Sequence, residues 1–240
     1  MVKETFDFAF IMKILPKVLK ALPVTLYITV WSAIFGWLFG LIFTCGKVSR
    51  YKRLGSVINV LTAVIRGIPT VVLLYLVYFG LPNLLKGLVG IDISQWQKTT
   101  FVIIAMALEL SMSSSEMFRS AYNSLDKGQL EAAHALGMTK WQRFVRIIFP
   151  QGLYVILPNL TSATMTLIQG TSLVYTLGVM DIMGKARQLN TNEMGLKSLE
   201  SYVTVALVYW AFSIIVIQIF KGLERRFGRG MKTAATSGNS

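Results

Sequence analysis

Hydrophobic residues fall into long runs along the chain, and short charged segments separate these runs. Residues 21–46 include 26 consecutive positions without a charge, and residues 201–220 include 20 more. A helix needs about 20 apolar residues to cross a hydrocarbon layer of about 30 Å. The pattern therefore predicts membrane-spanning helices. It does not show the amphipathic helices or alternating strands of a domain whose surface faces water.

Two further runs predict spans that carry charge inside them. Residues 54–85 are apolar except for Arg66. Residues 99–122 are apolar except for three side chains, Glu109, Glu116 and Arg119. Charges within a span are costly and mark either internal ion pairs or functional sites, so these residues are candidates for both.

The fourth run, residues 147–180, is uncharged over 34 positions. One straight helix of that length would measure about 50 Å and would overshoot the bilayer. We expect breaks at Pro150, Pro158, Gly170 and Gly178, which leave one span over 152–172 and a bent segment packed inside the protein. The sequence thus predicts an all-α membrane protein with five transmembrane helices.

Composition and charge agree with this prediction and indicate an orientation. Of 240 residues, 54% are hydrophobic and 15% charged, with a formal net charge of +13. Fourteen Lys and Arg residues fall in the segments on one side of the five spans and five in the loops on the other. Positive charge is retained on the cytoplasmic side, so we expect the N-terminus outside and the C-terminus in the cytoplasm.

Both ends of the chain are predicted to lie outside the transmembrane domain of residues 22–226. In residues 1–21, Lys13, Lys17 and Lys20 share one helical face, which predicts an amphipathic helix in the membrane interface. Residues 227–240 are small, polar and unpatterned towards their end, and we expect a disordered cytoplasmic tail.

Few residues carry the signature of chemistry. Cys45 and His134 are the single Cys and the single His, so they predict no disulfide and no metal site. Residues 40–48 approximate a phosphate-binding loop but have the wrong spacing and follow a membrane span, so we expect ATP to bind elsewhere. The clustering of charge in short loops also argues against a nucleic-acid partner.

The segment between the third and fourth spans, residues 126–150, is too polar to be embedded and too patterned to be a loose loop. It predicts two short helices. Gly137 ends the first helix, since glycine tolerates the left-handed conformation that closes a helix. Thr139 and Gln142 then form a capping-box pattern that begins the second. We expect a rigid hairpin on the cytoplasmic face, with residues 126–149 acting as one unit.

This segment closely resembles the EAA loop of permease subunits of ABC importers. The match rests on GQLEAAHALGM and on RIIFPQ, and the Gly-Gln pair in front resembles the polar amino-acid branch, which transports substrates such as glutamine, histidine or cystine. The sequence at 66–69, at 78–82 and at 171–173 is also similar to that branch. The resemblance covers residues 20–226.

The resemblance implies a type I ABC importer fold and a defined set of partners. These are two ATPase subunits, a second permease subunit, identical or not, and an extracytoplasmic substrate-binding protein, in the plasma membrane of a prokaryote. The chain itself would be no enzyme and bind no cofactor, because ATP and Mg²⁺ would sit on the ATPase. The residues that would couple to the ATPase are Gly128, Gln129, Glu131, Ala132, Ala133, Leu136 and Gly137.

Charges and polar residues within the spans supply the remaining candidates. Counting depth along straight helices places Arg66 nearest in depth to Glu116, which predicts a structural ion pair between them. Glu109 then lies near the midplane without an evident cation, so it is a candidate for a substrate pocket or for a hydrogen-bonded structural role. Three more pocket candidates precede or lie within the Thr-Ser-Leu stretch, and they could equally make helix-to-helix contacts: Gln169, Thr171 and Ser172.

The family often carries a charged pair before Thr-Ser-Leu, where this chain has Gln169 and Gly170. The missing acid argues against a carrier specific for lysine or arginine and leaves cystine, glutamine or another zwitterion open. The alternative function is an ion-coupled secondary transporter. Five spans without an internal repeat, together with the EAA segment, disfavour it.

Overall fold

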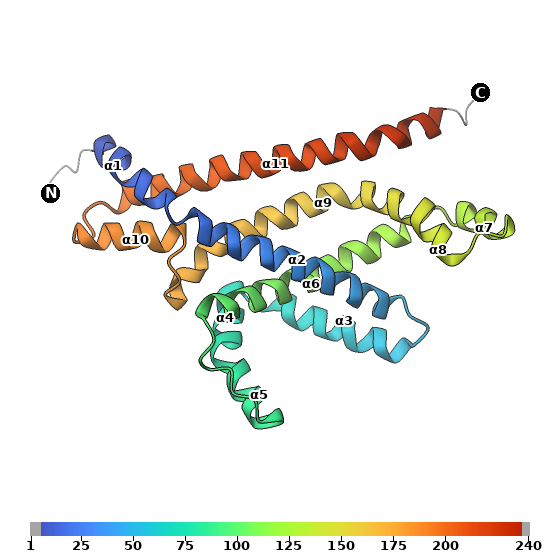
Figure 1. Ribbon diagram of the computed structural model, residues 1–240, viewed down its shortest axis with the longest axis horizontal. Coiled ribbons are helices and arrows are strands. Elements are labelled where there is room, and N and C mark those ends of the chain that lie inside the picture. Colours follow the sequence, from blue (N-terminus) through green and yellow to red (C-terminus); the bar gives the residue numbers. More distant parts are fainter. Residues whose placement is uncertain (1–5, 237–240) are drawn as a thin grey trace.

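The computed structural model describes residues 6–236, and every regular element among them is a helix (Figure 1). The α-helices are α1 (Phe8–Leu19), α2 (Leu22–Lys47), α3 (Lys52–Gly67), α4 (Thr70–Tyr75), α5 (Leu81–Val89), α6 (Lys98–Asn123), α7 (Lys127–Ala135), α8 (Lys140–Arg143), α9 (Phe149–Gly170), α10 (Ile182–Asn192) and α11 (Ser198–Thr236). Two π-helical turns, η1 (Leu76–Gly80) and η2 (Phe144–Ile148), and one 3₁₀ helix, η3 (Thr171–Leu177), join some of them.

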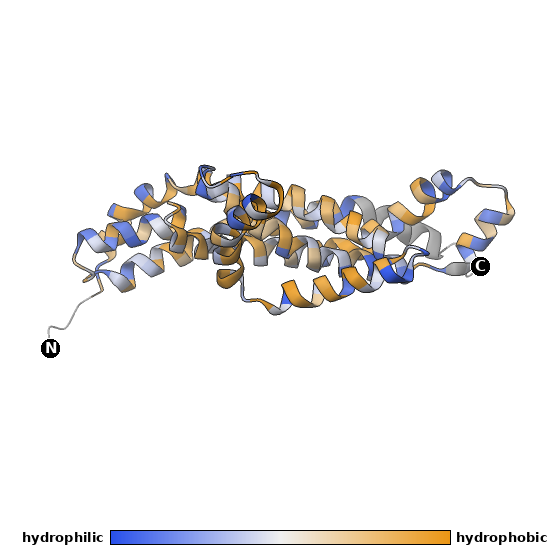
Figure 2. Cartoon of the chain, turned by 90° about the horizontal axis from the view of Figure 1, so that it is seen from below, coloured by the Kyte–Doolittle hydropathy of each residue, from blue (hydrophilic) through white to orange (hydrophobic). Residues whose placement is uncertain are grey.

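The long helices α2, α6, α9 and α11 run along the length of the molecule (Figure 1). Helix α6 packs against both α2 and α9, and α11 packs against α9. Helices α1 and α10 lie at one end, whereas α7 and α8 form the opposite end. Hydrophobic residues dominate the middle of the molecule and hydrophilic residues gather towards its ends (Figure 2). Five helical stretches of the described chain are long and apolar enough to cross a membrane, as the sequence predicts.

Small residues allow α2 and α6 to pack in close contact. A Cβ atom placed at Gly36 would lie 2.7 Å from Leu110, and one placed at Gly40 would lie 2.8 Å from Ser114. One turn further on, the Thr44 hydroxyl donates to the carbonyl oxygens of both Gly40 and Ser115. Such small residues bring membrane helices close enough for dispersion contacts and interhelical hydrogen bonds. The two helices are therefore held together along most of their length.

The second predicted span is broken, and its bounds are wrong. Helix α3 ends at Gly67, and Ile68 has an extended backbone with ψ of 128°. The cause is Pro69, because a proline disfavours the helical conformation of the preceding residue. A new helical run then begins at Thr70, so the stretch able to cross the membrane is Thr70–Val89 rather than 54–85. Helix α3 instead packs beside α2 and α6.

The fourth span is less broken than predicted. Helical structure continues without interruption from Lys140 to Leu177, and Pro158 lies inside α9. Membrane helices tolerate an interior proline where neighbours satisfy the freed carbonyl group. The predicted change after Gly170 does occur, since η3 begins at the next residue. The helical run then stops at Gly178, whose φ is +78°.

The two ends of the chain differ in how well the sequence predicts them. Helix α1 forms within the predicted segment, but its buried residues Phe10, Ile11, Ile14 and Val18 face protein, and Val18 packs in a cluster with residues of α10 and α11. The tail predicted to be disordered from residue 227 instead continues α11 to Thr236. Residues 1–5 and 237–240 lie outside the described part of the chain.

Candidate functional site

The hairpin of α7 and α8 forms as its sequence predicts. Asp126 caps α7 by accepting a hydrogen bond of 2.8 Å from the Gly128 N–H. Gly137 follows α7 with φ of +75°, a conformation that glycine adopts without a steric penalty. Thr139 and Gln142 make both hydrogen bonds of a capping box at the start of α8. Local signals alone therefore fix the shape of this hairpin.

The outer surface of the hairpin is exposed, and its apolar residues contribute to that surface. Leu136 is 83% exposed and Trp141 is 72% exposed, whereas Ala133 is buried. Glu131 and Ala132 are also exposed. At the base, the Gln151 side-chain amide donates a 2.7 Å hydrogen bond to the Gln129 side chain, which joins α7 to the first turn of α9. The hairpin thus exposes large apolar side chains and is tied to the start of α9.

A cavity of about 130 Å³ lies between α4, α6 and α9. Its polar lining is one carboxylate, Glu109, together with the hydroxyl-bearing side chains of Thr70, Ser113 and Thr166. The Thr70 hydroxyl donates a 2.8 Å hydrogen bond to Glu109. Within residues 6–236, no ion pair involves Glu109. Of the four predicted pocket residues, Glu109 alone lines this cavity.

The other three predicted pocket residues lie elsewhere. The Gln169 side chain is exposed, and the Ser172 hydroxyl donates to the Gln169 carbonyl oxygen. Thr171 is fully buried, where its hydroxyl donates to the Ile168 carbonyl oxygen and lies 3.0 Å from the Tyr209 hydroxyl. The contact of Thr171 with Tyr209 of α11 matches the helix-to-helix alternative, whereas the Ser172 hydrogen bond stays within its own helical run. The structure does not bring these three residues together with Glu109.

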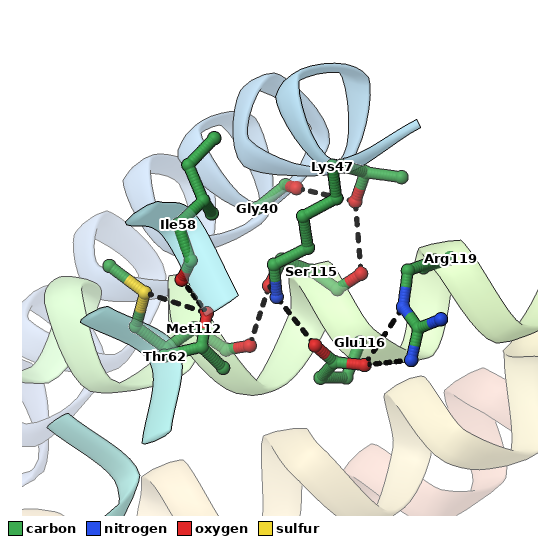
Figure 3. A network of polar contacts seen from close by, with 9 residues as sticks. Gly40, Lys47, Ile58, Thr62, Met112, Ser115, Glu116 and Arg119 are labelled. Atoms are coloured by element: carbon green, nitrogen blue, oxygen red, sulfur yellow. Dashed lines mark hydrogen bonds and ion pairs between the residues drawn. The ribbon is translucent and has the colours of Figure 1, made fainter. Parts of the chain in front are cut away.

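The predicted ion pair between Arg66 and Glu116 is wrong. Glu116 instead accepts from Lys47 at 2.6 Å and from Arg119 at 2.7 Å (Figure 3). The Lys47 ammonium also donates to the Ser115 hydroxyl at 2.7 Å, and the Lys47 side chain is fully buried. Arg66 is exposed, and in the described part of the chain it makes no ion pair.

Helix register explains why the predicted pair fails. The Thr62 hydroxyl lies against Met112 (Figure 3). The Thr70 hydroxyl reaches Glu109, so α3 and α4 run opposite to α6. Arg66 is four residues beyond Thr62 in one direction, and Glu116 is four residues beyond Met112 in the other. At about 1.5 Å per residue, the two are about 12 Å apart along the bundle.

Sequence reasoning also missed a buried carboxylate. Asp181 is fully buried at the start of α10, where it accepts from the Gly184 N–H at 2.8 Å and from the Tyr209 hydroxyl at 3.2 Å. Burial raises the pKa of the Asp181 carboxyl, and the donating N–H groups of Gly184 and Met183 offset part of that rise. The only sequence signal was an Asp directly before a helix, which indicates a cap and not a partner on α11.

The described residues hold no group of three or more His, Cys, Asp or Glu side chains that could bind a metal ion. The described chain instead offers an exposed apolar surface on the hairpin and a small cavity between the spans that one acid lines.

Residues 34–229 match the protein family described as "Binding-protein-dependent transport system inner membrane component". The chain is 34% identical to the probable amino-acid permease protein YxeN of Bacillus subtilis, over 96% of this chain and all of the relative. It is 32% identical to the L-cystine transport system permease protein TcyL of the same organism, over 98% of this chain and 97% of the relative.

Solved structures of ABC transporters also match this chain. A chain from the crystal structure of an amino acid ABC transporter with histidines is 29% identical, with a TM-score of 0.78, and covers 92% of this chain and 99% of that one. A chain from the inward-facing MetNI methionine ABC transporter is 18% identical with a TM-score of 0.65, over 88% of this chain and 95% of that one, which supports the fold.

Proposed function

Because this chain belongs to the family of inner membrane components of binding-protein-dependent transport systems, we propose that it forms the translocation path of an ABC importer for a polar amino acid. The relatives include permeases named for amino acids and for L-cystine, and they match over nearly their whole length. The chain is a multi-pass membrane protein with five spans. The substrate is a zwitterionic amino acid such as cystine or glutamine.

The observation that carries this proposal is the exposed hairpin of α7 and α8. A rigid body with a fixed turn at Gly137 can transmit the closure of a partner to the spans, whereas a flexible loop would absorb it. Its apolar residues Leu136 and Trp141 are exposed, as expected for a surface that docks on another subunit. That partner is a separate ATPase, which binds ATP and Mg²⁺, so this chain itself catalyses no reaction and needs no cofactor.

The remaining partners follow from the orientation. The α7 and α8 end faces the cytoplasm, so α1 and α10 lie at the extracytoplasmic surface of a prokaryotic plasma membrane. An extracytoplasmic binding protein delivers substrate there. A second permease subunit, identical or homologous, completes the path.

Glu109 is the side chain best suited to hold the substrate. An ammonium group is a triple donor, and the Glu109 carboxylate has capacity beyond the single hydrogen bond from Thr70. The hydroxyls of Ser113 and Thr166 line the same cavity and can bind the carboxylate or amide of an amino acid. The lining of this cavity holds no second acid, which favours a zwitterion over a cationic substrate.

Reconstitution into proteoliposomes tests the proposal. The chain is purified with the subunits that copurify with it, and uptake of radiolabelled cystine and glutamine is measured with the binding protein outside and ATP inside. We expect an ATPase with a phosphate loop in the preparation and uptake that requires ATP and persists when ion gradients are dissipated. Uptake that needs an ion gradient and no ATP would establish the secondary transporter instead.

A further inference from the structure

A second pocket lies at the α10 end of the molecule, away from Glu109. It has a volume of about 290 Å³ and is formed by η3 and α10. Val179 and Met180 contribute apolar lining, and Arg187, Gln188 and Asn192 contribute polar side chains from α10. The pocket thus combines one cation with neutral side-chain amides.

The cation of this pocket is held in place but not neutralised. The Arg187 guanidinium lies over the Tyr175 ring, 4.6 Å from its centroid, which restrains a long side chain without using its N–H donors. No ion pair involves Arg187 within the described chain. Two other cations at this end are paired with acids, since Lys13 meets Glu193 and Lys197 meets Asp7, whereas Lys185 donates to the side-chain oxygen of Gln188.

The amide beside Arg187 is oriented as a donor. The Gln188 side-chain oxygen accepts a 2.8 Å hydrogen bond from Lys185, which leaves its NH₂ group for a ligand. Guanidinium and amide donors together match the two acceptor oxygens of a carboxylate. Nothing in the polar lining is an acid, so a second cation would find no partner here.

We propose that the pocket of Arg187 and Tyr175 receives a carboxylate side chain of the extracytoplasmic binding protein when that protein docks. This rests on the proposed function, because it requires α10 to face the outside. The family description makes a binding protein the expected partner at this surface. An acidic side chain on that protein would complement an arginine that has no ion pair within the described chain. The pocket and the Glu109 cavity are neighbours along the chain, since η3 contains Tyr175 and directly follows Gly170, which lines that cavity.

The first experiment measures affinity. The intact transporter in nanodiscs is titrated with the binding protein that supports its uptake, at two salt concentrations. Arg187→Ala should raise the dissociation constant about 5-fold to 10-fold, and Arg187→Glu should raise it about 100-fold. Both increases should be smaller at high salt, because salt screens the charge interaction. Lys17→Glu is the matched control, because it makes a lysine-to-glutamate charge change at an exposed residue of α1, at the same end of the molecule but outside the pocket lining, and it should change affinity less than about 3-fold.

The ring under the guanidinium provides a second pair of variants. Tyr175→Phe keeps an aromatic face and should retain affinity, whereas Tyr175→Leu should weaken binding about 3-fold. A purely structural role for Tyr175 predicts equal losses at every salt concentration. Restoration of binding to Arg187→Glu by a single Asp or Glu to Lys change on the binding protein would identify the partner carboxylate.

Other outcomes overturn the site without touching the proposed function. If Arg187→Glu binds the protein normally but raises the KM for free amino acid in uptake, the pocket binds the carboxylate of substrate. If Arg187→Glu differs from the wild type only when the nanodisc contains anionic lipid, the pocket binds a lipid headgroup. If no binding protein stimulates the ATPase activity of the wild-type complex, the proposed function fails instead. If a Leu196→Cys variant with Cys45→Ser is labelled only from the cytoplasm, the proposed orientation fails.

Discussion

The buried contact between Lys47 and Glu116 leads to an asymmetric prediction. The Lys47 side chain has no exposed surface, whereas Glu116 retains 27% of its exposure and has a second partner in Arg119. Removing one member of a buried pair costs about 3–5 kcal/mol, because the other charge is left uncompensated. The two members of this pair are therefore unequal, since only one of them keeps a partner.

Glu116→Gln leaves the Lys47 ammonium buried against neutral groups. Water reaches Glu116, which reduces the penalty, so we expect a loss of about 2–3 kcal/mol of stability. Lys47→Met leaves Glu116 paired with Arg119 and partly solvated, and should cost about 1 kcal/mol or less. The double variant removes both charges and should be no worse than Glu116→Gln alone, which makes the two changes strongly non-additive.

Unfolding by SDS in mixed micelles, followed by tryptophan fluorescence, measures these differences for the purified complex. Arg119→Gln serves as the control, because it removes the more exposed partner and should cost about 0.5 kcal/mol. Equal losses for Lys47→Met and Glu116→Gln, or a double variant whose loss is the sum of the two, would refute the reasoning.

Three further predictions concern other contacts. Gly36→Ala places a Cβ against Leu110 and should cost about 1–3 kcal/mol in the same assay, whereas Gly152→Ala, with nothing within 4 Å, should be tolerated; equal effects would argue against close packing of α2 and α6. Alanine at Gln129 and at Gln151 should each reduce substrate transported per ATP, and the double variant should reduce it no further, whereas additive losses would show that their hydrogen bond is not the shared cause. Glu109→Gln should leave the yield of complex unchanged and raise the KM for uptake about tenfold, and unchanged kinetics would assign Glu109 a structural role.

Local signals explain what could be predicted. The α7 and α8 hairpin depends on a glycine at Gly137 and a capping pair three residues apart, and neither needs information from the rest of the fold. The resemblance of the chain to ABC importer permeases is likewise confirmed, because the family match spans residues 34–229. Long uncharged runs predict spans for the same reason, since burial in lipid acts on each run separately.

Register explains what could not be predicted. The pairing of Arg66 was inferred from depth along a predicted span, but α3 lies against α6 with Thr62 beside Met112, a register that carries Arg66 away from Glu116. Lys47 ends the first uncharged run, so the sequence places it among loop cations, although packing buries it fully. The contact of Asp181 with Tyr209 joins residues 28 positions apart on different helices, and no periodic pattern encodes it.

Three buried or half-buried carboxylates of the spans and their ends differ in how many of their acceptor sites are used. A carboxylate can accept about four hydrogen bonds, and a buried one is costly unless they are made. Glu116 is neutralised by Lys47 and Arg119, and Asp181 is held by a backbone N–H and a tyrosine hydroxyl. Glu109 has one hydroxyl from Thr70 and faces a cavity. Of these three carboxylates, it retains the most unused acceptor capacity, which is what an arriving ammonium group needs.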